Sequence, residues 1–260
     1  YRWATIGLTP DHVAAATIAE AEEFYRRYYR PSNAILSIVG DVEEQRVFEL
    51  AEKWFGGIKD NPYPITPLPK EPVQTEARRQ EVERDVPATT IVIAFHMGDR
   101  LSKDFYLGDI TSDLLAGGDS ARLYEHLIKG KSLFASVNAY ISGDVDEGMF
   151  VFTGQLLPTT SEQEAEATFW EEIALLQGAE ISDYELEKVK NKFEANTLFG
   201  ELNVMNKAMN LGYYSMIGDL PLINREIDIY RSLTKSEIAD FSKRVFTQEN
   251  SSTLIYRATK

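Results

Sequence analysis

Histidine and cysteine are considered first, because they supply most zinc ligands and many catalytic groups. The chain has no cysteine and three histidines, His12, His96 and His126. No two of them stand three or four residues apart, the spacing that places two side chains on one face of a helix. The run from Arg122 to His126 reads Arg-Leu-Tyr-Glu-His, a metallopeptidase signature with arginine in place of its first histidine, and a guanidinium cannot bind a cation. We therefore assign no metal ligand and no catalytic residue to this chain.

Other patterns that could carry chemistry are incomplete as well. Neighbouring carboxylates such as Glu171 and Glu172 are expected by chance in a chain with 41 acidic residues, and most should lie on solvated helix faces. Gly117 and Gly118 precede Asp119 and Ser120, but the Lys-Ser/Thr of a phosphate-binding loop is missing. A junction between two helices explains these residues better, with glycine ending one helix and Asp or Ser beginning the next.

Composition excludes further classes of function. The net charge of −14 and the pI of about 4.8 argue against binding to nucleic acid or to anionic membranes. The longest strongly apolar stretch, residues 34–39, is far shorter than the roughly 20 residues of a spanning helix. We expect a soluble protein without a membrane span. The compartment, cytoplasm or periplasm, stays open, because a targeting signal would lie in a missing upstream part.

The first sixty residues read as helix, strand and helix. Thr17 and Glu20 form a capping-box pattern at the start of a helix over 17–29, which Pro31 ends. Residues 33–40 read as a strand that is apolar on both faces and hence central in a sheet. We expect Asp41 to cap the next helix, at about 43–55.

Five prolines between residues 62 and 72 then indicate an extended connector. We predict a domain remnant at 1–60, a proline-rich linker at 61–78 and a second, non-metal-binding domain at 79–260. Its strands and helices do not alternate strictly, which favours the α+β class. The pattern predicts strands at 79–86, 88–97, 134–142, 147–156 and 252–257, and helices at 103–116, 120–129, 161–177, 182–201, 203–217 and 235–246.

An internal repeat becomes visible when the chain is aligned with itself at one constant offset. Residues 20–40 then align with 237–257, with Glu on Glu, Phe24 on Phe241 and Asn33 on Asn250. Two unrelated helix–strand units are the alternative. If the repeat is real, the chain is the tail of one domain followed by a complete second copy, and about 140 residues of the first domain are missing.

Two segments resemble the insulinase/pitrilysin family of zinc metallopeptidases. The first runs from Phe24 to Asp41 and is similar to the family's "fyxxyYxPxNaxLxxxGd" segment; the second, from Leu114 to Leu123, is similar to "LLGGGxSSRL". The positions that match these motifs are Pro31, Asn33, Gly40, Asp41, Gly117, Gly118, Ser120, Arg122 and Leu123. The resemblance implies duplicated α/β domains of the α+β class, of which the first is truncated here and the second is complete.

The resemblance also implies where the chemistry lies. The family's zinc ligands and general base belong to a His-x-x-Glu-His motif and a distal Glu in the first domain, upstream of these residues, so zinc is implied for the full-length enzyme and no cofactor for this chain. An Arg and a Tyr that polarise the substrate carbonyl come from the opposing half of the family's assembly. Ile128 and Ala135 stand at their positions here, so both are degenerate.

Three hypotheses follow. The chain is the C-terminal portion of a zinc metalloendopeptidase that hydrolyses unfolded peptides; or it belongs to a non-catalytic partner or structural subunit of a processing-peptidase-like complex; or it is an unrelated acidic α+β binding module. The expected partners are a peptide substrate and either a second family subunit with the Arg/Tyr pair or another copy of the chain. An acidic chamber wall would favour basic peptides, which the charge of −14 suggests as a hypothesis.

Overall fold

The computed structural model describes residues 7–60, 63–64, 67–143 and 145–259. The chain divides into two compact units. The first comprises Tyr1–Pro72 and Leu198–Asn224, and the second comprises Val73–Thr197 and Arg225–Lys260. The two units are considered separately below.

The second unit is built on a five-stranded sheet with the order β1-β5-β2-β4-β3. Its strands are β1 (Arg78–Arg84), β2 (Thr90–His96), β3 (Phe134–Ser142), β4 (Met149–Leu156) and β5 (Ser251–Ala258). β1 pairs in parallel with β5, and the other neighbours are antiparallel. β5 is therefore a central strand, although it comes last in the chain.

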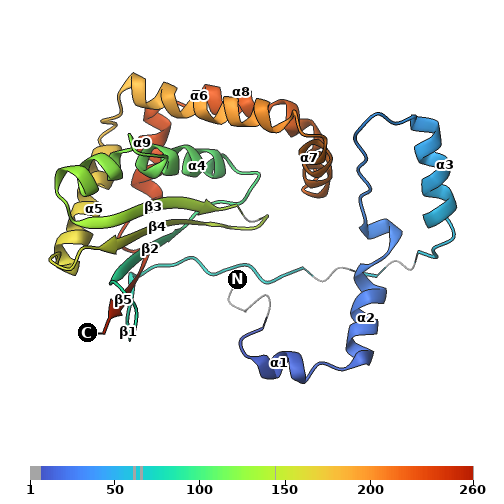
Figure 1. Cartoon of the computed structure of the whole chain (residues 1–260), viewed down its shortest axis with the longest axis horizontal. Coiled ribbons are helices and arrows are strands. Elements are labelled where there is room, and N and C mark those ends of the chain that lie inside the picture. The colour runs from blue at the N-terminus through green and yellow to red at the C-terminus, as the bar shows by residue number, and fades with distance from the viewer. Residues whose placement is uncertain (1–6, 61–62, 65–66, 144, 260) are drawn as a thin grey trace. The chain divides into compact units, whose positions relative to one another are not determined.

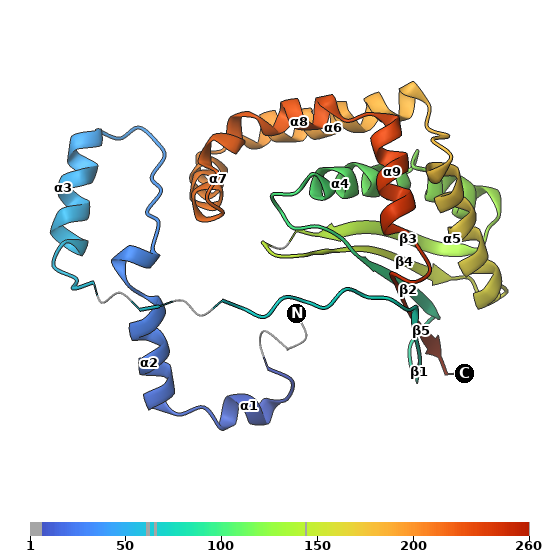
Figure 2. The same ribbon diagram turned by 180° about the vertical axis from the view of Figure 1, so that it is seen from behind.

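Three helices cover one face of this sheet, namely α4 (Lys103–Ala116), α5 (Glu162–Gln177) and α9 (Lys235–Val245), as Figures 1 and 2 show. Every second residue of β2, namely Ile91, Ile93 and Phe95, points into the core beneath them and is fully buried. Burial of this apolar face is the main stabilising term of the unit. α6 (Asp183–Gly200) and α8 (Glu226–Ser232) complete the helices that belong wholly or largely to it. Helices on one face of a largely antiparallel sheet are the α+β architecture predicted from the sequence.

The first unit contains helices without a core of comparable size. They are α1 (Pro10–Ala14), α2 (Ile18–Tyr28), α3 (Glu44–Phe55) and α7 (Val204–Met216), with short 3₁₀ turns η1 (Pro31–Asn33) and η3 (Leu220–Asn224). α2 begins with the capping box expected at Thr17 and Glu20, since each side chain bonds the backbone of the other residue. None of residues 7–60 is buried.

Two expectations for this unit were wrong. Residues 33–40 form no strand, although Ala34 has extended dihedrals, because a strand needs ladder partners and none of the described segments pairs with these residues. Asp41 does not cap α3, whose N-cap is Glu43. The helix begins too far along the chain for the Asp41 carboxylate to serve as its N-cap.

The other predicted strands and helices lie close to their expected ranges, whereas α1, α8 and the two 3₁₀ turns were not predicted, and one predicted helix has a different form. The helix expected at 120–129 is a π-helix over Tyr124–Gly130, labelled η2. Residues 63–64 and 67–77 contain neither helix nor strand, as their prolines require, while residues 61–62 and 65–66 of the expected linker lie outside the described part. The division at 1–60, 61–78 and 79–260 stays a prediction.

Candidate functional site

The motif from Gly117 to Leu123 forms the junction after α4. Gly117 is the residue after the helix, where a Cβ would lie 2.5 Å from the carbonyl oxygen of Asp113. Gly118 has φ +127°, a backbone conformation that side chains with a Cβ rarely adopt. These two glycines are thus required by the turn itself, as the sequence indicated.

Arg122 ties this junction to α6. Its Nε donates to Glu185 Oε1 at 2.8 Å, and its side chain also donates to the carbonyl of Glu180. Burial raises the pKa of Glu185, but the hydrogen bonds from Arg122 and Ser182 outweigh it and bring that pKa down to about 2. The Arg122 side chain is only 8% exposed, so it serves the packing of two helices and is not presented to a ligand.

Ser120 and Leu123 have similar structural roles. The carbonyl oxygen and the hydroxyl of Ser120 accept hydrogen bonds from Lys188 Nζ at 2.9 and 3.1 Å. Leu123 is fully buried in the hydrophobic core. The second motif therefore organises a junction between α4 and α6 and provides no reactive group.

The first motif likewise forms a turn. Pro31 opens the 3₁₀ turn η1, and the Asn33 side chain donates to the carbonyl oxygen of Tyr28 at 2.8 Å, which closes the end of α2. Gly40 and Asp41 are exposed and follow the extended segment. Among Pro31, Asn33, Gly40 and Asp41, the Asn33 side chain is the one whose hydrogen bond gives it a structural role.

Ile128 and Ala135, the two positions discussed for substrate polarisation, lie in irregular backbone. Ile128 is inside the π-helix η2 and packs partly buried against the core. Ala135 is exposed in β3, at the point where the pairing with β4 shifts register between Phe134 and Ser136. π-helices and bulges re-aim side chains and recur at functional sites. The two side chains present here can neither donate a hydrogen bond nor carry charge.

The histidines do not fit a zinc site. His126 Nδ1 lies 2.7 Å from Glu172 Oε1, the Nδ1 of His12 accepts from the amide of Leu8, and His96 lies at the end of β2. No group of three or more His, Asp or Glu side chains within the described ranges could hold a metal ion. No catalytic step is therefore derived through a metal bound by these side chains.

Comparison with known families decides the assignment. Residues 15–193 match the family described as peptidase M16 inactive domain. The chain belongs to the peptidase M16 family. This match confirms the resemblance to insulinase-type zinc peptidases.

Relatives of this M16 chain include proteins named as zinc proteases. The chain is 34% identical to the zinc protease PqqE of Helicobacter pylori over 196 residues, which are 73% of this chain and 43% of that protein. It is 22% identical to the uncharacterized zinc protease YmxG of Bacillus subtilis over 250 residues, 95% of this chain and 59% of that protein. The chain thus spans about half the length of these relatives.

Solved structures show the same fold. A protease from Helicobacter pylori superposes with a TM-score of 0.88 at 26% identity, covering 96% of this chain and 61% of that one. A peptidase M16 inactive domain from Pseudomonas fluorescens superposes with a TM-score of 0.82 at 17% identity, covering 96% and 60%. The second likeness concerns the fold alone.

The helix-free face of the sheet is a feature that sequence reasoning missed. Each of the five strands contributes four side chains to it, in the register that the pairing fixes. None of them is Asp or Glu, although the chain has 41 acidic residues. They are Arg78, Gln80, Val82, Arg84, Thr90, Val92, Ala94, His96, Ser136, Asn138, Tyr140, Ser142, Met149, Val151, Thr153, Gln155, Ser252, Leu254, Tyr256 and Ala258. The side chains that share a face of each predicted strand can be read from the sequence. The order of the strands in the sheet is needed to see that these five sets lie side by side on one face.

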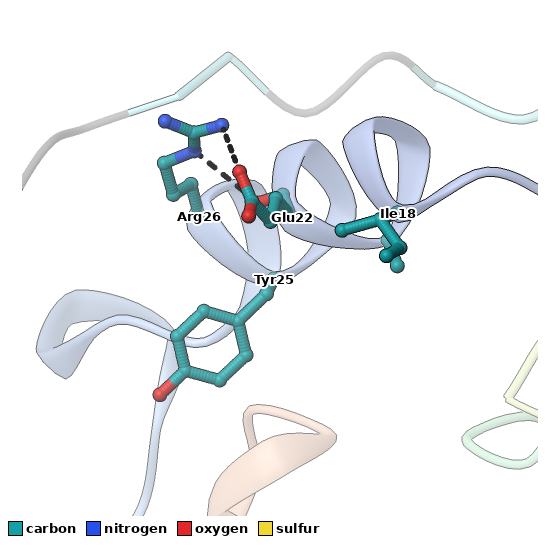
Figure 3. Close-up of a pocket in the computed structure, with 5 residues that line it drawn as sticks. Ile18, Glu22, Tyr25 and Arg26 are labelled. Atoms are coloured by element: carbon teal, nitrogen blue, oxygen red, sulfur yellow. Dashed lines mark hydrogen bonds and ion pairs between the residues drawn. The ribbon is translucent and has the colours of Figure 1, made fainter.

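One further surface feature of the M16 chain is a hollow that a single helix lines. A shallow hollow on the surface of α2 is lined by Ile18, Ala21, Glu22, Tyr25 and Arg26, all from that one helix (Figure 3). It reflects an exposed helix surface and not a cavity between elements.

Among the helices of the described residues, none is both long and apolar enough to cross a membrane.

A buried polar network joins α4 to α8. Arg100 donates to Glu226 at 2.5 Å and to the Tyr106 hydroxyl at 3.1 Å, and the Tyr230 hydroxyl donates to Asp109 at 2.5 Å. Burial raises the pKa of Asp109 against the hydrogen bond from Tyr230, and burial beside Asp109 also raises the pKa of Tyr230. The network links α4 and the turn before it to α8 within the second unit. Removing one member would leave a buried charge without its partner, which is strongly destabilising.

Proposed function

We propose that this chain is the non-catalytic, C-terminal portion of an M16 zinc metallopeptidase that hydrolyses unfolded peptides. The match of residues 15–193 to the M16 inactive domain carries this proposal. The names of the relatives support the zinc peptidase chemistry, and the scattered histidines support an origin of the zinc ligands outside these 260 residues. In that arrangement, the metal would supply an activated water, and this chain would help to enclose the peptide.

We place the peptide-facing surface of this chain on the helix-free side of the sheet. That face is broad, partly apolar and without carboxylates, and its only Arg or Lys side chains are Arg78 and Arg84. A peptide passing along these strand side chains would meet no carboxylate, so we expect acidic segments to be tolerated there. This proposal differs from the hypothesis of an acidic wall, because none of the twenty strand side chains on this face is Asp or Glu.

The test uses the full-length gene product and two fluorogenic unfolded peptides that differ only in charge, one acidic and one basic. Asn138→Asp places a carboxylate on the face, on the edge strand β3, and changes the side chain little. We expect the ratio of kcat/KM for the acidic peptide to that for the basic peptide to fall about threefold or more, mainly through KM.

Gln163→Glu is the matched control, because it adds the same charge at an exposed position of α5 on the helix side. It should leave the ratio unchanged. Chelator-sensitive cleavage by the wild-type product supports the peptidase assignment. Equal effects of the two substitutions contradict the assigned face, and cleavage that survives chelation contradicts the zinc peptidase.

A non-catalytic partner or structural subunit is the second candidate, and Ile128 and Ala135 suit it as well as they suit a zinc-carrying subunit whose partner supplies Arg and Tyr. An M16 chain that lacks the Arg and Tyr of its family depends on a partner for substrate polarisation, supplied by a second family subunit or by another copy. A full-length product that is inert alone but accelerates cleavage when mixed with an Arg/Tyr-bearing subunit supports an active, partner-dependent enzyme. A product that binds no zinc and never cleaves belongs to the structural alternative.

A further inference from the structure

Two arginines on the helix-free side of the edge strand β1 have no carboxylate partner within the described part of the chain. Arg78 and Arg84 are both exposed, and the Arg84 guanidinium donates to the backbone carbonyl oxygen of Glu83 at 2.7 Å. Glu76 and Asp85 flank the strand, but neither forms an ion pair with these arginines. Both guanidinium groups are therefore available to an acid from outside.

Arginine is used differently elsewhere in the second unit. Arg79 follows Arg78 directly but points to the other side of the sheet, where it donates to Glu166 of α5 at 2.8 Å. Six arginines of this unit pair with a carboxylate, namely Arg79, Arg100, Arg122, Arg231, Arg244 and Arg257. In a chain of net charge −14, two cations on a face without strand carboxylates stand out as a positive site.

The spacing of the two arginines suits an extended ligand. Arg78 and Arg84 begin and end β1, and the even separation between them places both side chains on one face of the strand. At about 3.3 Å per residue, they are roughly 20 Å apart along the strand. An extended peptide has the same rise, so two of its carboxylates six residues apart would match the two guanidinium groups.

The surface between the arginines is polar at one point and otherwise apolar. Gln80 and Val82 lie between them on β1, and Leu254 and Tyr256 lie beside these two residues on β5. Val82, Leu254 and Tyr256 are each partly exposed. Apolar side chains of a ligand could bury part of this area between the two charged ends.

We propose that this part of the sheet binds an extended peptide segment with two carboxylates six residues apart and apolar side chains between them. The binding strip consists of Arg78, Gln80, Val82, Arg84, Leu254 and Tyr256. Charge complementarity favours this occupant over a second copy, because a symmetric contact through the strip would bring arginine against arginine. The inference rests on the proposed function in taking an unfolded peptide as the ligand, and it names the class of peptide.

Binding of dye-labelled peptides to the full-length gene product tests the strip. Fluorescence anisotropy is measured with a chelator present, so that no peptide is cleaved. The first peptide contains Glu-Ser-Leu-Ser-Leu-Ser-Glu, the second has Gln for both Glu, and the third has its second Glu one position earlier. We expect the first to bind about fivefold more tightly than the second, and this advantage to vanish at about 0.5 M salt. The third should bind at least about twofold more weakly than the first, because odd spacing turns one carboxylate to the opposite face.

Arg78→Gln and Arg84→Gln should each reduce the advantage of the first peptide about two- to threefold and leave the second peptide unaffected. Arg79→Gln is the matched control, since it removes the same charge from the same strand but on the side of α5. It should not change the advantage. Arg78→Glu combined with Arg84→Glu should transfer the preference to a peptide with Lys for both Glu.

Equal effects of Arg78→Gln and Arg79→Gln overturn the proposal, because they would show a response to net charge alone. Equal binding of the three peptides, as when an upstream segment or a second copy covers the strip, overturns it too. These measurements need no cleavage. A product that keeps the spacing preference but shows no chelator-sensitive cleavage contradicts the peptidase proposal only, and cleavage without the preference contradicts only the strip.

Discussion

Asn33 and Asn250 close the ends of two helices in the same way, each donating from Nδ2 to the carbonyl oxygen five residues earlier, at 2.8 and 2.9 Å. They differ in what lies around them. Asn250 Nδ2 also donates to the carbonyl oxygen of His96 at 2.9 Å and so joins the end of α9 to β2, whereas Asn33 lies in an exposed turn. The same hydrogen bond is thus part of a buried core in only one of these two segments.

This difference predicts unequal effects of one substitution. Asn250→Ala leaves two backbone carbonyls of a partly buried turn without their donor, and we expect it to lower the free energy of unfolding by about 1–3 kcal/mol. Asn33→Ala in the same 260-residue chain should change it much less, since water replaces the lost donor. Urea denaturation followed by circular dichroism measures both. Equal losses would contradict the interpretation.

The buried pair of Arg100 and Glu226 predicts a large loss of stability. Their side chains are 5% and 10% exposed, so Glu226→Ala leaves a buried guanidinium without its carboxylate, at a cost of about 3–5 kcal/mol. Glu22→Ala, which removes the exposed partner of Arg26, should have no measurable effect. Thermal unfolding of the two variants checks this, and a similar melting temperature for both would refute it.

Glu185 predicts a dependence of stability on pH. Its pKa of about 2 in the folded chain lies below the ordinary value of 4.5, so its pairing with Arg122 stabilises the fold above about pH 5. That contribution is lost as the pH falls from 4.5 towards 2. Glu185→Gln should therefore be less stable than the wild type by about 1–3 kcal/mol at pH 6 and by little at pH 2.5.

Urea midpoints at the two pH values measure this convergence. Glu164→Gln, which removes an exposed carboxylate of α5, is the control and should show no such trend. If the difference in stability between the wild type and Glu185→Gln grows as the pH falls, the predicted direction of the pH dependence is contradicted.

The turn at Gly118 predicts a backbone effect. With φ at +127°, Gly118→Ala should cost about 1–2 kcal/mol although no atom lies within 4 Å of the added methyl group. Gly57→Ala also meets nothing within 4 Å, and it has no positive φ, so it should be neutral or slightly stabilising. Denaturant titration compares the two variants, and equal stabilities would exclude strain at Gly118.

Much of the second unit could be predicted from the sequence, because its patterns are local. The helices at 103–116 and 235–246 and the strand at 134–142 follow from periodicity, and the junction at Gly117 follows from its glycines. The family could be predicted from two motifs. Even the capping box at Thr17 was visible, since only two residues three positions apart are needed.

The failures share a dependence on distant partners. Residues 33–40 have the apolar pattern of a central strand, but a ladder requires neighbours that the described chain does not provide. The π-helix at 124–130 and the register shift at Ala135 each depend on one extra residue, which leaves hydrophobic periodicity almost unchanged. The face without carboxylates depends on strand order, which spacing along the chain does not reveal.

The central claim is that the zinc chemistry of this M16 protein resides outside these 260 residues, and zinc stoichiometry tests it most directly. The chain and the full-length product are dialysed with zinc and then against buffer, and bound metal is measured by atomic emission. We expect about one zinc per full-length molecule and far less than one in the 260-residue chain. One tightly held zinc in the shorter chain, lost on His126→Ala or His96→Ala, would contradict it.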